Sequence, residues 1–258
     1  MLAPRADGLL DVRRALPGAA LAPYVHHLWS VRWRLDSPFV GAALPHPSAQ
    51  ITAVSAVGGP RAEVVGVRRG RLAARLEGEG WTLGIAFRPA MFQPVLGEPM
   101  TSVTGRVVPL GELVASTAKT AGWLRAIAAT RDPHERFAIT ESFLAPRLPP
   151  PPPSVVRLRD LVERMAADRS MLRLADLCDA SGLDERALQR AFRTYVGVSP
   201  KWVIQRYRLH EAAAQLRGPH PPDLATLAAS LGYADQAHFT RDFKRLVGET
   251  PGSFANRR

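Results

Sequence analysis

The stretch FTRDFKRLVGETP at residues 239–251 has the pattern of a short amphipathic helix that ends at a glycine and a proline. Phe239 and Phe243 lie four residues apart and therefore share one helix face, while hydroxyl and basic side chains occupy the faces beside it. By itself this pattern is typical of many basic surface helices. It becomes informative because the chain contains it twice.

The first copy is LQRAFRTYVGVSP at residues 188–200, which aligns with 239–251 position by position. The aligned pairs are Leu188 with Phe239, Arg190 with Arg241, Phe192 with Phe243, Arg193 with Lys244, Val196 with Val247, Gly197 with Gly248, and Pro200 with Pro251. Upstream of each copy, LADLCDASG at 174–182 matches LATLAASLG at 224–232. The second half of the chain is therefore an internal duplication.

Both copies follow the same physical pattern. A short helix with small residues lets a second helix approach closely, and a glycine at its end (Gly182 or Gly232) permits the left-handed backbone of a sharp turn. An amphipathic helix follows, with aliphatic or aromatic residues inward and Arg, Gln or Thr outward. This pattern predicts a helix-turn-helix, whose second helix enters the DNA major groove. A helical protein-binding module is the weaker alternative, because it needs neither the duplication nor the matched outward arginines.

Residues 155–258 resemble the DNA-binding domain of the AraC/XylS family of transcriptional regulators. The resemblance rests on the pair Gly232-Tyr233, the Phe-x-Arg-x-Phe-Lys run at 239–244, the pattern Gly248-x-x-Pro251, and RLHEAAAQL at 208–216, which resembles the connecting helix of the family. It implies an all-α domain of seven helices with two helix-turn-helix motifs. It also implies a regulator that is more often an activator than a repressor.

The sequence departs from the family pattern near its end. The family usually has a basic residue directly after the closing aromatic residue, whereas here Ala255 follows Phe254. Arg257 and Arg258 come only beyond it. This departure leaves no basis for expecting a phosphate contact at that point.

The two recognition helices are expected at about residues 184–196 and 235–247. Arginine pairs bidentately with guanine and glutamine with adenine, so the outward Arg and Gln side chains are candidates for reading bases. Arg193 and Lys244 lie later on their helices and are better placed for phosphates, with solvated surface charge as the alternative. For His238, either a base contact or a role at the helix start stays open. The predicted DNA-binding residues are Arg186, Gln189, Arg190, Arg193, Gln236, His238, Thr240, Arg241 and Lys244.

The composition is compatible with a nucleic-acid partner but does not locate one. The chain has 258 residues, with 34 Lys and Arg against 23 Asp and Glu and a net charge of +11, spread over both halves. The lone Cys178 excludes an internal disulfide framework, and no apolar run approaches the length of a membrane span. Because the start of the chain also lacks the apolar core of a secretory signal, we expect a cytoplasmic protein that does not contact a membrane.

The clearest boundary is the proline run in LPPPPPS at 148–154, which can neither continue a helix nor enter a sheet interior. A surface loop within one domain is the alternative. The prediction is an α+β chain with a β-rich domain at 1–148, a proline-rich linker at 149–154 that few contacts cross, and the DNA-binding domain at 155–258.

Before the linker, strand patterns come first and helical patterns follow. The strand candidates are WSVRWRLD at 29–36, ITAVSAV at 51–57, AEVVGV at 62–67, RLAARLEG at 71–78 and WTLGIAFR at 81–88. Helical patterns cover 110–129 and 133–148. This order predicts a small antiparallel sheet or barrel with helices packed on one side.

By the same resemblance, the first half would form the cupin-like domain that binds an effector or a partner in many family members. GIAFRPAMFQPVLGEP at 84–99 is similar to a segment of one subgroup of such domains. The candidate pocket residues are Trp29, Trp33, Trp81 and Phe87, with plain core packing as the alternative. The expected partner is double-stranded DNA, and RNA polymerase, a small-molecule effector and a second copy of the chain (a homodimer) are further candidates.

Two enzymatic alternatives for the protein can be weighed from the sequence. A metal-dependent enzyme would need a His/Glu cluster on neighbouring strands, but adjacent His26 and His27 on a strand would point to opposite faces, and His46 lies between two prolines. A DNA-repair alkyl acceptor would use several cysteines, whereas Cys178 aligns with the small Ala228. We therefore expect a regulator that is not an enzyme, without metal, cofactor or catalytic residues.

Overall fold

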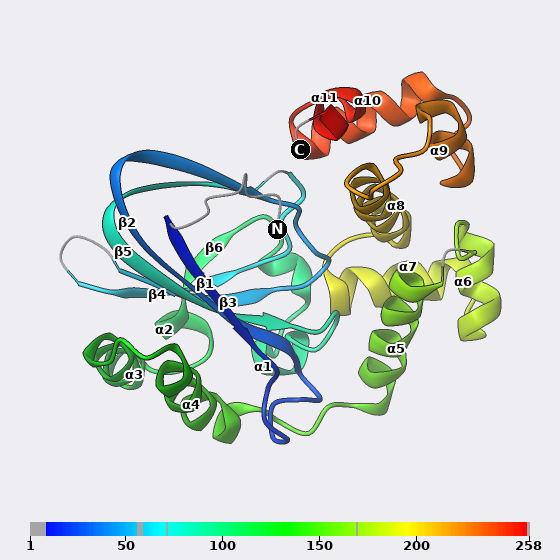
Figure 1. Cartoon of the computed structure of the whole chain (residues 1–258). Coiled ribbons are helices and arrows are strands. Elements are labelled where there is room, and N and C mark those ends of the chain that lie inside the picture. The colour runs from blue at the N-terminus through cyan, green and yellow to red at the C-terminus, as the bar shows by residue number, and fades with distance from the viewer. Residues whose placement is uncertain (1–8, 56–58, 71, 169, 257–258) are drawn as a thin grey trace.

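The computed structural model describes residues 9–55, 59–70, 72–168 and 170–256. The first half of the chain folds into a curved antiparallel sheet with helices beside it, and the second half is helical (Figure 1). This is the α+β arrangement that the sequence predicts. Among the described residues, no helix is both long enough and apolar enough to cross a membrane. Parts of two predicted strands (56–57 and 71) and the pair Arg257 and Arg258 lie outside the described ranges.

The described strands form a single sheet in the order β1-β2-β5-β3-β4-β6. They are β1 (Leu10–Ala15), β2 (Val25–Ala43), β3 (Gln50–Val54), β4 (Arg61–Val65), β5 (Leu72–Phe87) and β6 (Val107–Pro109). The predicted strands at 71–78 and 81–88 are joined in β5, which pairs with β2 along most of its length. Gly78 has a φ of 59° beside the register shift between Leu35 and Phe39, so the strand bends there without ending.

Helices lie along one face of this sheet, as the sequence predicts (Figure 1). They are α1 (Gln93–Leu96), the 3-10 turn η1 (Met100–Ser102), α2 (Leu110–Leu113), α3 (Thr117–Ala129), α4 (Pro133–Leu144) and the 3-10 turn η2 (Ala145–Arg147). The Trp123 ring of α3 stacks on Phe143 of α4 with 4.9 Å between the ring centres. Arg136 of α4 lies 4.3 Å from the ring centre of Trp81 in β5, which fixes the helix pair to the sheet.

Residues 153–256 contain seven α-helices in their described part, the number that the family resemblance implies. They are α5 (Pro153–Ala167), α6 (Leu174–Ser181), α7 (Glu185–Ala191), α8 (Pro200–Leu216), α9 (Leu224–Ser230), α10 (Gln236–Val247) and α11 (Pro251–Asn256), and the π-helical turn η3 (Phe192–Val196) extends α7. The duplication is visible in the backbone. Gly197 and Gly248 end the second helix of each motif with φ values of 89° and 93°, and Gly182 and Gly232 follow the first with 68° and 72°. Both motifs therefore turn at the positions where the sequence places glycine.

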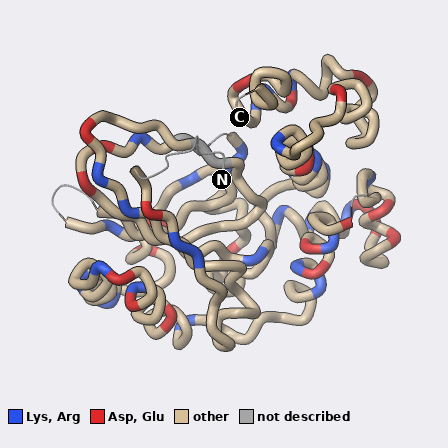
Figure 2. Tube along the Cα trace, in the orientation of Figure 1, with Lys and Arg blue, Asp and Glu red and all other residues tan. Residues whose placement is uncertain are grey.

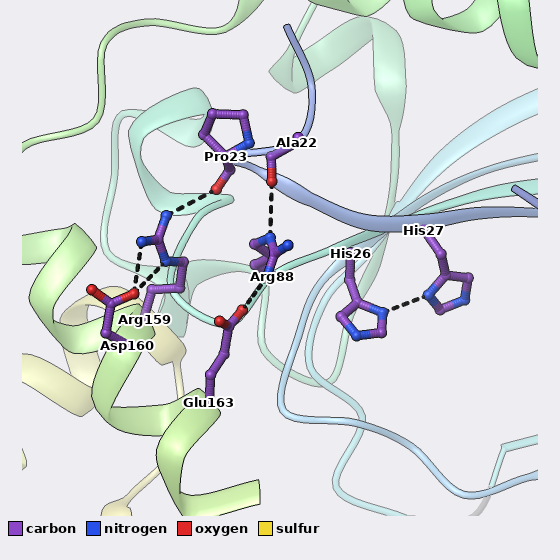
Figure 3. A network of polar contacts seen from close by, with 8 residues as sticks. All are labelled: Ala22, Pro23, His26, His27, Arg88, Arg159, Asp160 and Glu163. Atoms are coloured by element: carbon purple, nitrogen blue, oxygen red, sulfur yellow. Dashed lines mark hydrogen bonds and ion pairs between the residues drawn. The ribbon is translucent and has the colours of Figure 1, made fainter. Parts of the chain in front are cut away.

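The expectation that few contacts cross the proline linker is wrong. The Tyr24 hydroxyl donates to the Pro149 carbonyl oxygen. Arg88 pairs with Glu163 of α5 at 2.6 Å (Figure 3). Arg159 of α5 also donates to the Pro23 carbonyl oxygen at 3.3 Å. Helix α5 begins within the predicted linker, at Pro153, because a proline at the first helical position sacrifices no intrahelical hydrogen bond. The prolines thus lead the chain directly into a helix that is docked on the first half.

The two motifs belong to different apolar clusters. The first motif shares one continuous cluster with the sheet, in which Val155, Leu188 and Phe192 pack together with Ile51 and Ile85. The second motif has a separate cluster, formed by apolar residues of α9, α10 and α11 with Leu209, Ala212, Ala213 and Leu216 of α8, and Leu44 of the first half packs against it. Val203 and Ile204, near the start of α8, belong to the first cluster. Helix α8 therefore connects two separate cores.

Candidate nucleic-acid interface

The second helix of each motif begins at an aspartate that caps it. The Asp184 carboxylate accepts a hydrogen bond from the Ala187 N–H at 2.7 Å, and the Asp235 carboxylate accepts one from the His238 N–H at 2.7 Å. These caps start α7 and α10 at equivalent positions of the duplication. Because Asp235 is the cap, the His238 side chain does not serve at the helix start.

Each of these helices buries its apolar stripe completely. Leu188 and Phe192 in the first motif, and Phe239 and Phe243 in the second, have no solvent-exposed surface. Their burial turns the polar face of each helix outward. The exposed members of the predicted DNA-binding set are Arg186, Gln189, Arg190, Arg193, Gln236, His238, Arg241 and Lys244, and Thr240 is half-buried.

Most cationic side chains of the predicted DNA-binding set lack a partner in the described part of the chain. Within the described residues, the side chains of Arg186, Arg190, Arg193, Arg241 and Lys244 make no hydrogen bond or ion pair. Elsewhere on the described surface some arginines pair with carboxylates, as Arg61 does with Glu63 at 2.7 Å, whereas others, such as Arg32 and Arg125, have no such partner. Basic residues are spread over both halves of the molecule (Figure 2), so the overall charge does not single out these helices. What distinguishes these helices is that cations without a partner among the described residues recur at equivalent positions on the outward face of both copies, which suits a polyanion.

Arg193 lies where the first recognition helix meets the first half of the chain. It lines a groove of about 340 Å³ together with Arg69, Thr101 and Trp202. Next to this groove, the Thr104 hydroxyl donates to the Gly197 carbonyl oxygen at 2.9 Å. The C-terminal end of the first recognition helix is therefore in contact with the first half, whereas its N-terminal turns are exposed.

Asp242 is a polar residue of α10 that the sequence-based prediction missed. It is 5% exposed, and its partners are Gln205 of α8, whose side-chain amide donates to it, Arg245 at 2.7 Å and the His238 ring at 3.4 Å. Helical spacing gave a signal for it: Asp242 lies three residues after Phe239 and therefore falls on the buried stripe. Asp242 is itself buried, but it contacts the exposed side chains of His238 and Arg245 on the outward face of α10.

The four aromatic residues predicted for an effector pocket do not come together. Trp29 and Trp33 lie on one face of the sheet, where their rings cover Gly84 and Gly80 of the neighbouring strand β5. Trp29 also donates to Gln50 at 3.2 Å, and Trp33 packs in a small cluster with Val31 and Leu35. Trp81 and Phe87 contribute to the main core on the other face. Because the two pairs lie on opposite faces of the sheet, the four residues cannot line one cavity.

His26 and His27 are oriented differently from the sequence-based expectation. Adjacent strand residues point to opposite faces, but a register shift between Val25 and His27 places an extra residue in β2. As a result, the Nδ1 atoms of the two rings lie 2.8 Å apart (Figure 3). Even so, the described residues contain no group of three or more His, Cys, Asp or Glu side chains that could hold a metal ion.

Cys178 lies in α6, partly buried against the main core, as expected for a small packing residue. Burial raises the pKa of its thiol, and the nearby carboxylates of Glu185, Asp179 and Asp184 raise it further. The environment therefore disfavours the thiolate, which is the form that reacts with alkyl groups.

Comparisons with known proteins agree with this geometry. Residues 177–257 match a sequence family described as "Helix-turn-helix domain". A protein of Streptomyces lividans named as an AraC-like transcription regulator is 35% identical over 81 residues, and the HTH-type transcriptional activator RhaR of Yersinia pseudotuberculosis is 33% identical over 84 residues. Residues 177–257 form an AraC-type helix-turn-helix domain.

The relatives extend well beyond the AraC-type domain. The matched segments cover 31% and 33% of this chain, and only 26% of the Streptomyces lividans protein and 29% of RhaR. Outside the AraC-type domain, residues 13–109 match a family described as "Domain of unknown function (DUF6597)".

Some similar solved structures match only part of the chain, and others match almost its whole length. An AraC-type transcriptional regulator from Chromobacterium violaceum is 25% identical, with a TM-score of 0.35, and the match covers 39% of this chain and 91% of that one. ToxT from Vibrio cholerae is 10% identical, with a TM-score of 0.46, and the match covers 96% of this chain and 98% of that one.

Proposed function

We propose that the chain is a sequence-specific, DNA-binding transcriptional regulator whose recognition helices α7–η3 and α10 enter the major groove. The observation that carries this proposal is the matched pair Arg190 and Arg241. They occupy the same position in the two copies, both are exposed, and neither has a partner among the described residues. A guanidinium held in this way can pair with the O6 and N7 atoms of guanine or with phosphate oxygens.

The remaining predicted residues divide by their place on the helices. We propose that Arg186 and Gln189, in the first turns of α7, and Gln236, at the start of α10, reach base edges. His238 lies in the same turn as Gln236, and Thr240 lies one turn further along. Arg193 and Lys244 lie later, where we propose that they hold phosphates and set the register without reading sequence.

Two recognition helices in one chain imply a bipartite DNA site. Because α8 joins the motifs, the two half-sites should lie about 10 base pairs apart on one side of the duplex. The outward residues of the two copies differ, so the half-sites need not be symmetric. Selection of bound duplexes from a randomised library by the purified full chain, followed by footprinting, tests this. Enrichment of two unlike half-sites at this spacing supports the proposal, and a bound pool as random as the input refutes it.

We further propose that the protein activates transcription, without enzymatic activity, under the control of an effector or partner at its first half. The matched relatives are named as regulators, one of them as a transcriptional activator. The proposed partners are double-stranded DNA and RNA polymerase. We also propose that the chain forms a homodimer through the helices at 109–146 and that it acts in the cytoplasm. Transcription in vitro from the selected site, with and without the protein, separates activation from repression.

A further inference from the structure

Asp242 is the only Asp or Glu side chain that is buried among the described residues. A buried carboxylate is costly unless its oxygens are hydrogen-bonded or paired with charge. It lies in the middle of the recognition helix α10, one turn after His238. In the first copy the equivalent residue is Ala191, so the fold of the motif does not itself require an acid here.

The two oxygens of Asp242 have different partners. Oδ1 accepts a hydrogen bond from Arg245 at 2.7 Å. Oδ2 accepts one from the side-chain amide of Gln205 in α8 and lies 3.4 Å from Nε2 of His238. The carboxylate therefore joins the connecting helix to the recognition helix and also faces the histidine ring.

The His238 ring is held on two sides. Nε2 faces Asp242, and the ring meets Tyr233 edge to face, with 5.3 Å between the ring centres and an interplanar angle of 87°. The side chain is nevertheless 51% exposed. A carboxylate 3.4 Å from Nε2 favours the neutral tautomer with hydrogen on Nε2, which leaves the lone pair on Nδ1. Nδ1 is then the ring atom through which His238 can accept a hydrogen bond from a partner.

We propose that Asp242 is a positioning residue that fixes the hydrogen-bonding sense of His238 toward DNA; this rests on the proposed function. In the major groove, adenine and cytosine carry amino groups that donate, whereas guanine and thymine present only acceptors at that edge. An acceptor at Nδ1 therefore selects adenine or cytosine at the base facing His238. The device belongs to the second copy alone, because Ala191 cannot provide it in the first.

The test is the substitution Asp242→Asn, which keeps the shape and reverses the hydrogen-bonding sense. Arg245 donates to Oδ1, so the amide oxygen stays on that side and the amide NH₂ takes the place of Oδ2. The Gln205 amide can flip to accept from it. The NH₂ group now donates to Nε2 of His238, which moves the ring hydrogen to Nδ1 and turns that atom into a donor.

The readout is the base preference of purified full-length chains on a randomised library. The wild type should favour adenine or cytosine at one position by roughly fivefold, the worth of one hydrogen bond. Asp242→Asn should favour guanine or thymine at that same position, and adding His238→Ala should remove the preference in both backgrounds. Asp179→Asn, an exposed site in α6, changes the net charge equally and should alter no preference.

The outcomes separate this proposal from the proposed function. A wild-type chain that selects no sequence refutes both. A wild-type chain that selects a site, together with an Asp242→Asn variant that keeps the same base preference and only binds all sequences more weakly, shows that Asp242 is purely structural and overturns the proposal.

A measurement on the wild type covers the case in which Asp242→Asn does not fold. Nitrogen-15 NMR of the imidazoles distinguishes the two neutral tautomers, and the His238 signal is assigned by its loss in His238→Ala. We expect the tautomer with hydrogen on Nε2 in the free protein at neutral pH. Finding the hydrogen on Nδ1 would overturn the proposal without any variant at Asp242.

Discussion

The Thr104 side chain donates a 2.9 Å hydrogen bond to the carbonyl oxygen of Gly197, the residue that ends the first recognition helix. Gly197 has a φ of 89°, and a Cβ built on it would lie 2.3 Å from Thr104 Oγ1 and 3.1 Å from the Met100 side chain. This glycine is therefore required twice, once for its backbone conformation and once for the close approach of the first half of the chain.

Gly197→Ala should destabilise the protein more than Gly182→Ala. Gly182 has a φ of 68° but open space around its Cβ position, so alanine there should cost only the left-handed backbone, about 1–2 kcal/mol. At position 197 the overlap with Thr104 should add about 1–3 kcal/mol. Urea titration of the two variants, read by circular dichroism, gives the comparison.

The partner residue provides the control for that prediction. Thr104→Ala removes the hydroxyl that the new methyl group would strike, so the loss caused by Gly197→Ala should be smaller in that background. Equal losses in both backgrounds would show that the contact between the halves contributes nothing.

Arg190→Ala and Arg241→Ala should each weaken binding to the selected site by about 1–3 kcal/mol and relax preference at one or two base pairs. Both guanidinium groups are exposed and unpaired in the described structure, so neither substitution removes a structural contact. Binding titrations on the selected and scrambled duplexes measure the effect. An unchanged ratio of the two affinities would mean that these arginines do not read bases.

Lys244→Ala should behave differently, because it lies late on α10 and is proposed to hold a phosphate. The loss should be alike for selected and scrambled duplexes. The log–log slope of affinity against salt should flatten by roughly one unit. A loss confined to the selected duplex would instead place Lys244 among the base-reading residues.

A fragment covering 153–258 should keep its helices but lose protection in α5 and in the first motif. Phe192 and Leu188 pack in the cluster that includes the sheet, whereas Phe239 and Phe243 pack in a cluster within the second motif and α8. Amide hydrogen exchange should therefore speed up in α5, α7 and η3 and stay nearly unchanged in α10. Uniform loss of protection would contradict the division into two cores.

The junction between α8 and the loop after β2 should weaken in mild acid. His210 of α8 donates from Nε2 to the Pro45 carbonyl oxygen at 3.2 Å, and its ring lies 4.4 Å from that of His46. Burial lowers the pKa of His210 to about 4, an effect that the nearby Arg206 charge reinforces. This pKa is below the usual value of 6.5. The contribution of neutral His210 to the free energy of unfolding is therefore complete above pH 6.5 and is lost as the pH falls toward 4.

His210→Gln keeps a side-chain N–H for Pro45 but cannot be protonated. The free energy of unfolding should fall between pH 7 and pH 5 in the wild type. In this variant the fall should be smaller, by on the order of 1 kcal/mol. Thermal melts at the two pH values provide the measurement. The same substitution at exposed His134 of α4 should leave the pH dependence unchanged, and if His210→Gln does so too, the junction is not sensitive to acid.

The repeat made the second half predictable from sequence. Equivalent glycines, inward Phe residues and exposed arginines all lie where the alignment of 188–200 with 239–251 places them, because each is set by local spacing along one helix. Of the first half, the strand regions and the helices beside them were predictable for the same reason: period-two and helical patterns are local.

Features that depend on distant parts of the chain were not predictable. Residues 71–78 and 81–88 join into one strand because both pair with β2. The orientation of His26 and His27 depends on a bulge in that same pairing. The packing of the first motif against the sheet depends on surfaces that no local pattern describes. Asp242 is the intermediate case: its spacing from Phe239 placed it on the buried face, but only the tertiary structure shows that Gln205 and Arg245 make an acid acceptable there.

The two ends of α8 lie in different apolar clusters. Sequence changes in the two motifs therefore differ in how far their effects reach into the rest of the protein. A substitution at Phe192 disturbs the cluster that the first motif shares with the sheet, whereas one at Phe243 disturbs the cluster of the second motif and α8, which Leu44 alone among the described residues of the first half joins. Effects at residues that share no packing partners add independently. The second motif can therefore accumulate changes and acquire a new DNA target while the first half of the protein stays intact, which makes it the freer of the two to evolve.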